Sequence, residues 1–64
     1  MNSTQCEAVA RYLRLHGTIT AAEAYERLHI MRLAARVENL RKRGMEIKTT
    51  MVGEGRVKYA RYSL

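Results

Sequence analysis

Several residue types are missing from this 64-residue sequence, and each absence narrows what the chain can do. It has no Phe, Trp, Pro or Asp, and Cys6 is its one cysteine. A lone cysteine excludes an intrachain disulfide and a cysteine-rich metal site. With His16 and His29 as the only histidines, the chain has neither an acid–base pair nor the histidine spacing of a zinc site. We therefore expect no enzymatic activity, no metal, no cofactor and no small-molecule ligand.

Long hydrophobic runs are missing as well. No stretch is long enough to span a bilayer, and the opening residues MNSTQCEAV have neither the basic region nor the apolar core of a signal peptide. A single thiol fits a reducing compartment. We therefore expect a cytoplasmic protein without a membrane segment. The hydrophobic content of 47% is that of a globular fold, so residues 1–64 are expected to form a single domain.

The charge, in contrast, is strongly positive and unevenly distributed. The formal net charge is +6, and the isoelectric point is near 10.1. Residues 1–29 contain three Arg and three Glu, whereas residues 30–64 contain nine Lys or Arg and three Glu, so the second half carries the whole excess. A basic half of this kind indicates a polyanionic partner, with nucleic acid ahead of an anionic membrane surface.

Apolar residues at helical spacing predict a first helix. It is expected to begin near Thr4, because the residues TQCE have the form of a capping box, and to end at Gly17. Its expected buried stripe is Cys6, Val9, Ala10 and Leu13. In that stripe Cys6 is a small core residue rather than a reactive thiol. Leu15 points away from the stripe.

Two further helices are expected after the short strand-like segment TIT. The second helix begins at Thr20, where TAAE forms another capping box, and ends at Leu28–His29. Its expected apolar face is Ala21, Ala24, Tyr25 and Leu28. The third helix is expected from about Met31 to Arg43, with Gly44 as the residue that ends it. The short separation of the two helices indicates a helix-turn-helix with a large crossing angle.

After Gly44 the period of the apolar residues changes from helical to alternating. The segments MEIKTTMV and RVKYARYSL alternate on either side of Gly53-Glu54-Gly55, a pattern that predicts a β-hairpin. The inward positions of this hairpin are expected to be Ile47, Ala60, Tyr62 and Leu64, with Tyr59 pointing away from the core. One core is expected to contain Leu13, Leu28, Leu33, Val37, Leu40, Ile47 and Tyr62.

A helical wheel shows how the third helix distributes its charge. At about 100° per residue, Leu33, Val37 and Leu40 lie within about 60° of each other and form the expected packing face. Another group, again spanning about 60°, is expected on the side roughly opposite: Arg32, Arg36, Asn39 and Arg43. Arginine matches the base edge of guanine, and asparagine matches that of adenine. The pattern therefore predicts a helix suited to the DNA major groove. A salt bridge is expected between Glu38 and Lys42.

The segments GTITAAEAYERLHIMRLAARVENLRKRGMEI, residues 17–47, and GEGRVKYARYSL, residues 53–64, resemble the winged helix-turn-helix family, in particular its very small phage, prophage and bacterial members. The resemblance implies an α+β fold of three helices and a C-terminal two-stranded hairpin, the wing. His29 stands where the turn of the family usually has Gly, and Met31 stands where many members have Ser or Thr.

The resemblance also implies how DNA would be contacted. The third helix enters the major groove, and the wing touches an adjacent groove or the backbone. The implied DNA-binding residues on and before the third helix are Met31, Arg32, Ala35, Arg36, Asn39, Lys42 and Arg43. Those on the wing are Arg56 and Lys58.

The sequence leaves three functions open. The first is sequence-specific binding of double-stranded DNA as a transcriptional regulator. The second is an architectural, excisionase-like accessory protein that bends DNA. The third is a winged-helix adaptor that binds protein, which the charge of +6 disfavours. A homodimer on a two-part DNA site is compatible with the small size of the domain.

Overall fold

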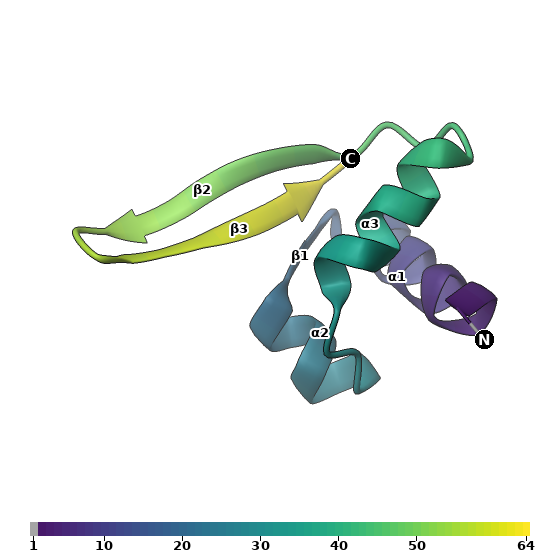
Figure 1. The fold of residues 1–64 in the computed structure, drawn as a ribbon, viewed down its shortest axis with the longest axis horizontal. Helices are drawn as coiled ribbons and strands as arrows, with labels where there is room; N and C mark the ends of the chain where they lie inside the picture. Colours follow the sequence, from purple (N-terminus) through teal and green to yellow (C-terminus); the bar gives the residue numbers. More distant parts are fainter. Residues whose placement is uncertain (1) are drawn as a thin grey trace.

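The structure is a computed structural model that describes the backbone of residues 2–64 and the side chains from Thr4 onward. Three helices are followed by a long hairpin that projects away from them (Figure 1). The elements in chain order are α1 (Asn2–His16), β1 (Thr18–Thr20), α2 (Ala21–Leu28), α3 (Leu33–Lys42), β2 (Lys48–Glu54) and β3 (Val57–Ser63). The order and type of these elements agree with the sequence-based prediction, whereas the first residues of α1 and α3 differ from it.

The first helix begins earlier than its sequence predicts. Because α1 starts at Asn2, Thr4 lies inside the helix and the predicted capping box at Thr4 is wrong. Nothing in the local sequence blocks this extension, since no Gly or Pro precedes Thr4. The predicted end is confirmed: Gly17 has a φ of 84°, and its N–H donates to the carbonyl of Leu13 at 2.7 Å.

The second helix has the predicted capping box. The Thr20 hydroxyl accepts from the backbone N–H of Glu23 at 3.3 Å, and the Glu23 carboxylate accepts from the backbone N–H of Thr20 at 3.1 Å. The helix ends at His29, which adopts the left-handed conformation with φ 57° and ψ 35°. Histidine therefore takes the backbone conformation that a Gly would adopt without a steric penalty. Of the predicted apolar face, Ala24 is buried and Leu28 half-buried, but Ala21 and Tyr25 are exposed.

The third helix begins two residues later than predicted. Arg32 has φ −120° and ψ 60°, which is not helical, so Met31 and Arg32 belong to the turn and α3 begins at Leu33. At the other end Gly44 has the predicted role, with a φ of 99°. The N–H of Gly44 donates to the carbonyl of Arg41 at 3.0 Å, and the next N–H donates to that of Leu40 at 3.1 Å. This is the hydrogen-bond pattern of a Schellman motif.

The predicted hairpin is part of a three-stranded antiparallel sheet with the strand order β1-β3-β2. The segment TIT forms β1, which adds to the hairpin by pairing with β3, and Ile19 lies opposite Tyr62. The β2 and β3 strands are joined by Gly55 and Arg56, because Glu54 pairs directly with Val57. Gly55 has a φ of 61° while Arg56 has no positive φ, as expected of a two-residue turn with Gly at its first position.

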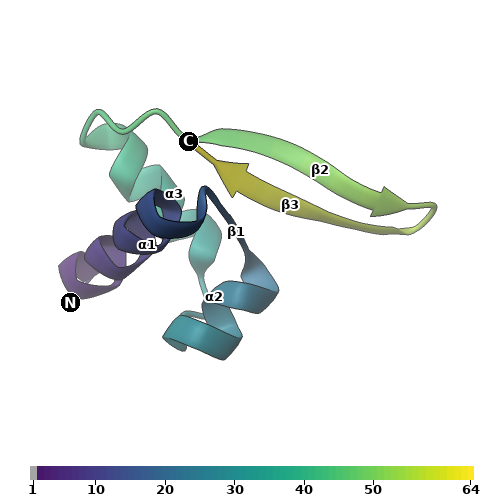
Figure 2. The ribbon, with the colours of Figure 1, turned by 180° about the vertical axis from the view of Figure 1, so that it is seen from behind.

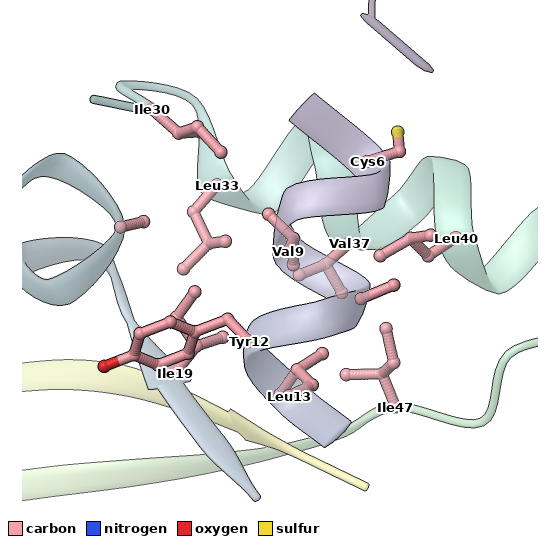
Figure 3. Close-up of a cluster of buried hydrophobic side chains, with 12 residues drawn as sticks. Cys6, Val9, Tyr12, Leu13, Ile19, Ile30, Leu33, Val37, Leu40 and Ile47 are labelled. Atoms are coloured by element: carbon pink, nitrogen blue, oxygen red, sulfur yellow. The ribbon is translucent and has the colours of Figure 1, made fainter. Parts of the chain in front are cut away.

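The core lies between α1 and α3 and extends to β1 and to the start of the hairpin (Figure 3). Leu13, Ile19 and Val37 are fully buried in it. The predicted core is confirmed for Leu13, Leu33, Val37, Leu40 and Ile47, while Leu28 and Tyr62 pack against its edge. The predicted inward position of Leu64 is wrong, because that side chain is 47% exposed. Leu64 follows the last residue of β3, so the register of the strand no longer fixes its direction.

Candidate nucleic-acid interface

The basic stripe of α3 does not face solvent along its whole length. Arg36 is only 9% exposed, and its guanidinium Nη1 lies 3.4 Å from the side-chain oxygen of Gln5 on α1. At about 100° per residue the stripe lies about a quarter of a turn from the apolar face, not opposite to it. Packing of α1 on that flank therefore covers Arg36. The prediction that Arg36 points outward is wrong.

The other predicted residues remain accessible to different degrees. Met31 is 82% exposed, and Arg32 beside it in the turn is exposed as well. Ala35 and Asn39 are half-buried on α3. The remaining four are exposed: Lys42 and Arg43 at the end of α3, and Arg56 and Lys58 on the hairpin. The structure thus brings together an accessible surface around the turn and α3, and a second one on the hairpin.

Arg43 lies away from the turn that precedes α3. Its side chain lines an open groove between α1 and the end of α3, together with Arg11, Arg14 and Met45. Arg32 lines a different pocket at the beginning of α3. The two ends of the predicted stripe therefore belong to different surface depressions, which the helical wheel alone does not show.

Arg41 lies outside the stripe, and it makes several contacts that the sequence did not predict. Its Nε and Nη2 donate to the carbonyl of Ile47 at 3.1 and 2.8 Å, and Nη2 also donates to the Thr49 hydroxyl at 2.7 Å. Its Nη1 pairs with Glu38 at 3.1 Å, so Glu38 pairs with Arg41 rather than with the predicted Lys42. Arg41 therefore fixes the base of the hairpin against α3. The one indication of this contact in the sequence was the position of Arg41 on the helical wheel, beside the apolar face of the helix.

The strand register defines the two faces of the hairpin. Tyr62 is half-buried against the core, so Ala60 and Lys58, which alternate with it, lie on the face that continues from the core side. Tyr59 and Arg61 lie on the opposite face, and both are exposed. Lys58 therefore shares the α3 side of the hairpin with Thr49, the residue that Arg41 contacts. Arg61 is an exposed basic residue that the sequence analysis did not select.

The exposed basic residues have little compensation. Among the side chains described, from Thr4 onward, the Glu38–Arg41 contact is the one ion pair. The same residues contain no group of three or more His, Cys or Glu side chains placed to hold a metal ion. No helix within residues 2–64 is long and apolar enough to cross a membrane. Apart from Arg41, the exposed basic side chains of α3 and the hairpin thus make no ion pair with a described residue.

Three helices, a helix-turn-helix formed by α2 and α3, and a hairpin that extends from the sheet define the winged helix-turn-helix class (Figure 2). The sequence model of the family described as winged helix-turn-helix domain matches residues 4–64, and the chain belongs to this family. Searches among curated proteins and solved structures gave no significant match. The hairpin of β2 and β3 is hereafter called the wing.

Proposed function

We propose that this single domain binds double-stranded DNA in a sequence-specific manner and regulates transcription. In this proposal the turn before α3 and the exposed side of α3 enter the major groove, and the wing contacts an adjacent groove or the backbone. The observation that carries the proposal is the set of exposed basic side chains on these two elements of a winged helix-turn-helix domain: Arg32, Lys42, Arg43, Arg56 and Lys58. Such a surface attracts DNA phosphates, and the DNA releases condensed counterions when these phosphates are neutralised.

Residues in this surface have different expected roles. Arg32 and Asn39 keep polar groups at or near the surface and can form bidentate contacts with guanine and adenine. Met31 and Ala35 supply apolar contact beside them. Lys42, Arg43, Arg56 and Lys58 are expected to neutralise phosphates, which fixes the orientation of the domain without reading sequence. Because Arg36 is buried, the proposal assigns it no base contact. The protein acts in this proposal without enzymatic activity.

The test is binding to a selected site and to random duplex DNA across a salt series. If four to six phosphates are neutralised, the logarithm of the binding constant falls against the logarithm of salt with a slope of roughly −4 to −5. Asn39→Ala should weaken binding to the selected site by about 1–3 kcal/mol and change random-DNA binding far less, and Arg32→Ala should weaken binding to the selected site by more than it weakens binding to random DNA. Arg56→Ala should weaken both and reduce the slope by about one.

The outcomes separate this function from its alternatives. No binding to duplex DNA at low salt would contradict DNA binding and favour a protein adaptor. Binding without any preference for a selected site, together with DNA bending in a circularisation assay, would favour an architectural role. Loss of discrimination in Arg56→Ala, with discrimination kept in Arg32→Ala, would make the wing the reader of sequence. Analytical ultracentrifugation of the complexes with the selected site and with random DNA reports whether one or two copies of the protein bind.

A further inference from the structure

Arg36 is an unusual charged residue because it is buried without an acidic partner. The side chain is 9% exposed, and its Nε has no hydrogen-bond partner among the described residues. The one hydrogen bond that its guanidinium makes to them is the long 3.4 Å bond to the Gln5 side-chain oxygen. A buried guanidinium carries a large desolvation cost that a single neutral acceptor offsets only in part. This side chain therefore has donor capacity that the fold does not use.

No carboxylate of the chain compensates this charge. Among the described side chains the one ion pair is at the other end of α3, between Glu38 and Arg41. Residues 1–3, whose side chains lie outside the description, are Met, Asn and Ser and contribute no acidic group. A negative charge that pairs with Arg36 would therefore have to come from outside the chain.

An open pocket at the beginning of α3 provides the space for such a charge. It is lined by Gln5 of α1, by His29, Met31 and Arg32 of the turn, and by Arg36. Two of these five residues are arginines, and none is acidic. The pocket combines side chains from α1, the turn and α3, so it exists only in the folded domain.

The adjacent helix end adds a third feature that favours an anion. Arg32 is the N-cap of α3 and makes no side-chain capping bond, and the first turn of the helix has no acidic residue. The N–H groups of this first turn have no partner within the helix. They give the N-terminus of the ten-residue α3 a partial positive charge. The helix end, Arg32 and Arg36 all favour negative charge on the same side of the domain.

We propose that this pocket binds a phosphate group, with the guanidinium of Arg36 as its buried donor and Arg32 as its exposed second cation. A phosphate offers several acceptor oxygens, which suits the planar donor fork of arginine. The phosphate is either a free inorganic phosphate ion or a phosphodiester of the DNA backbone. In the second case the inference rests on the proposed function, and Arg36 contributes to docking rather than to base reading.

The experiment follows the amide and arginine Nε resonances of the intact 64-residue chain by NMR. Sodium phosphate is titrated at constant ionic strength against sodium chloride, and a short random duplex DNA is titrated separately. We expect saturable shifts at Gln5, Arg32 and Arg36 in at least one of the two titrations. The Arg36 Nε–H is the most specific probe, because it has no hydrogen-bond partner in the part of the chain that the structure describes.

Three variants test the assignment. Arg36→Gln removes the buried donor and should weaken binding at the pocket by about tenfold or more. Arg32→Gln serves as a second variant that avoids the core, because Arg32 is exposed, and should also weaken binding. Arg14→Gln is the matched control: it removes one positive charge from the exposed surface of α1, away from the pocket and outside the proposed DNA-binding residues, and should leave these shifts unchanged.

Each outcome decides between the sources or contradicts the proposal. Shifts with free phosphate that Arg32→Gln weakens and Arg14→Gln keeps would support a site for the free ion. Shifts with duplex DNA alone, with the same response to the variants, would support a backbone phosphate. Absence of shifts in both titrations, or equal weakening by Arg32→Gln and Arg14→Gln, would contradict phosphate binding at this pocket. DNA binding without shifts at the pocket residues would support the proposed function and contradict the phosphate site. Phosphate binding without DNA binding would support the phosphate site and contradict the proposed function.

Discussion

The helical part of the molecule and the wing are held together by different forces. Every buried hydrophobic side chain among the described residues lies between Cys6 and Ile47, and none belongs to β2 or β3. The wing is instead formed by strand pairing over seven residue pairs, from Lys48–Ser63 to Glu54–Val57. Its connection to the helices is the pairing of β1 with β3, the half-buried Tyr62 and the hydrogen bonds of Arg41. Changes in the helical part should therefore unfold the domain, whereas changes at the base of the wing should loosen the wing first.

This difference matters for the proposed function. A hairpin without a core of its own has marginal stability by itself, so its position depends on the contacts at its base. Arg41 is thus a residue that places the wing relative to α3 rather than a residue that reads DNA. The two arginines of α3 in this comparison, Arg41 and Arg36, use their hydrogen-bond donors differently. Arg41 uses its donors on the protein, whereas Arg36 keeps a donor unused.

The largest effect is expected in the helical part. Leu13 is fully buried, and Leu13→Ala should lower the free energy of unfolding by about 2–5 kcal/mol through lost apolar contacts and a cavity. Leu15, on the same helix, is 73% exposed, so Leu15→Ala should change it by less than about 0.5 kcal/mol. Urea denaturation followed by circular dichroism measures both. Equal effects of the two substitutions would contradict the observed packing face of α1.

The base of the wing should give a smaller and more local effect. Arg41→Ala removes the bonds to the Ile47 carbonyl and the Thr49 hydroxyl, which should cost about 1–3 kcal/mol. Hydrogen exchange should become faster in β2 and β3 while α1 remains protected. Lys42→Ala is the control, since Lys42 is exposed beside Arg41 and should change stability by less than about 0.5 kcal/mol. Uniformly faster exchange in α1 and the wing would show that the wing does not open independently of the helical part.

The smallest effect concerns pH and Glu23. Partial burial works to raise the pKa of this carboxyl, but hydrogen bonds from Tyr12 and Thr20, with the charge of Arg27, outweigh it and hold the pKa below the usual range of a glutamate. The Tyr12 hydroxyl lies 3.0 Å from Glu23, and burial followed by this acceptor raises the pKa of Tyr12. The tyrosine therefore keeps its proton and stays a donor throughout the acid range.

The sign of the pH effect follows from the depressed pKa of Glu23. The stabilisation by the carboxylate is fully present above the pKa of the unfolded state, about 4.3, and is lost as the pH falls through the lower pKa of the folded state. The free energy of unfolding of the wild type should therefore exceed that of Glu23→Gln by about 0.5–1.5 kcal/mol at neutral pH, and this difference should become smaller as the pH falls. Thermal unfolding of both proteins from neutral to acid pH measures this difference. A constant difference would show that ionisation of Glu23 contributes nothing.

Features with a local cause could be predicted from the sequence. The capping box of Thr20 and Glu23, the end of α3 at Gly44 and the hairpin around Gly55 each depend on a few neighbouring residues and their preferred backbone conformations. Together with the spacing of apolar residues, they determined the order of the elements and five members of the core. The family resemblance rests on the same local signals, and the match over residues 4–64 confirms it.

The roles of individual side chains depended on neighbours that are distant in the sequence, so only the tertiary structure decided them. Arg32, Arg36 and Arg43 share one stripe on the wheel, but α1 packs over that flank. One arginine is therefore buried against Gln5, 31 residues away, while the other two lie at separate depressions. In the same way Arg41 turned from a flank residue into the contact that holds the wing. A sequence fixes which face of a helix is apolar, because that depends on the period of the helix. Which polar flank stays in water depends on where the next helix packs, because burial is a property of the whole fold.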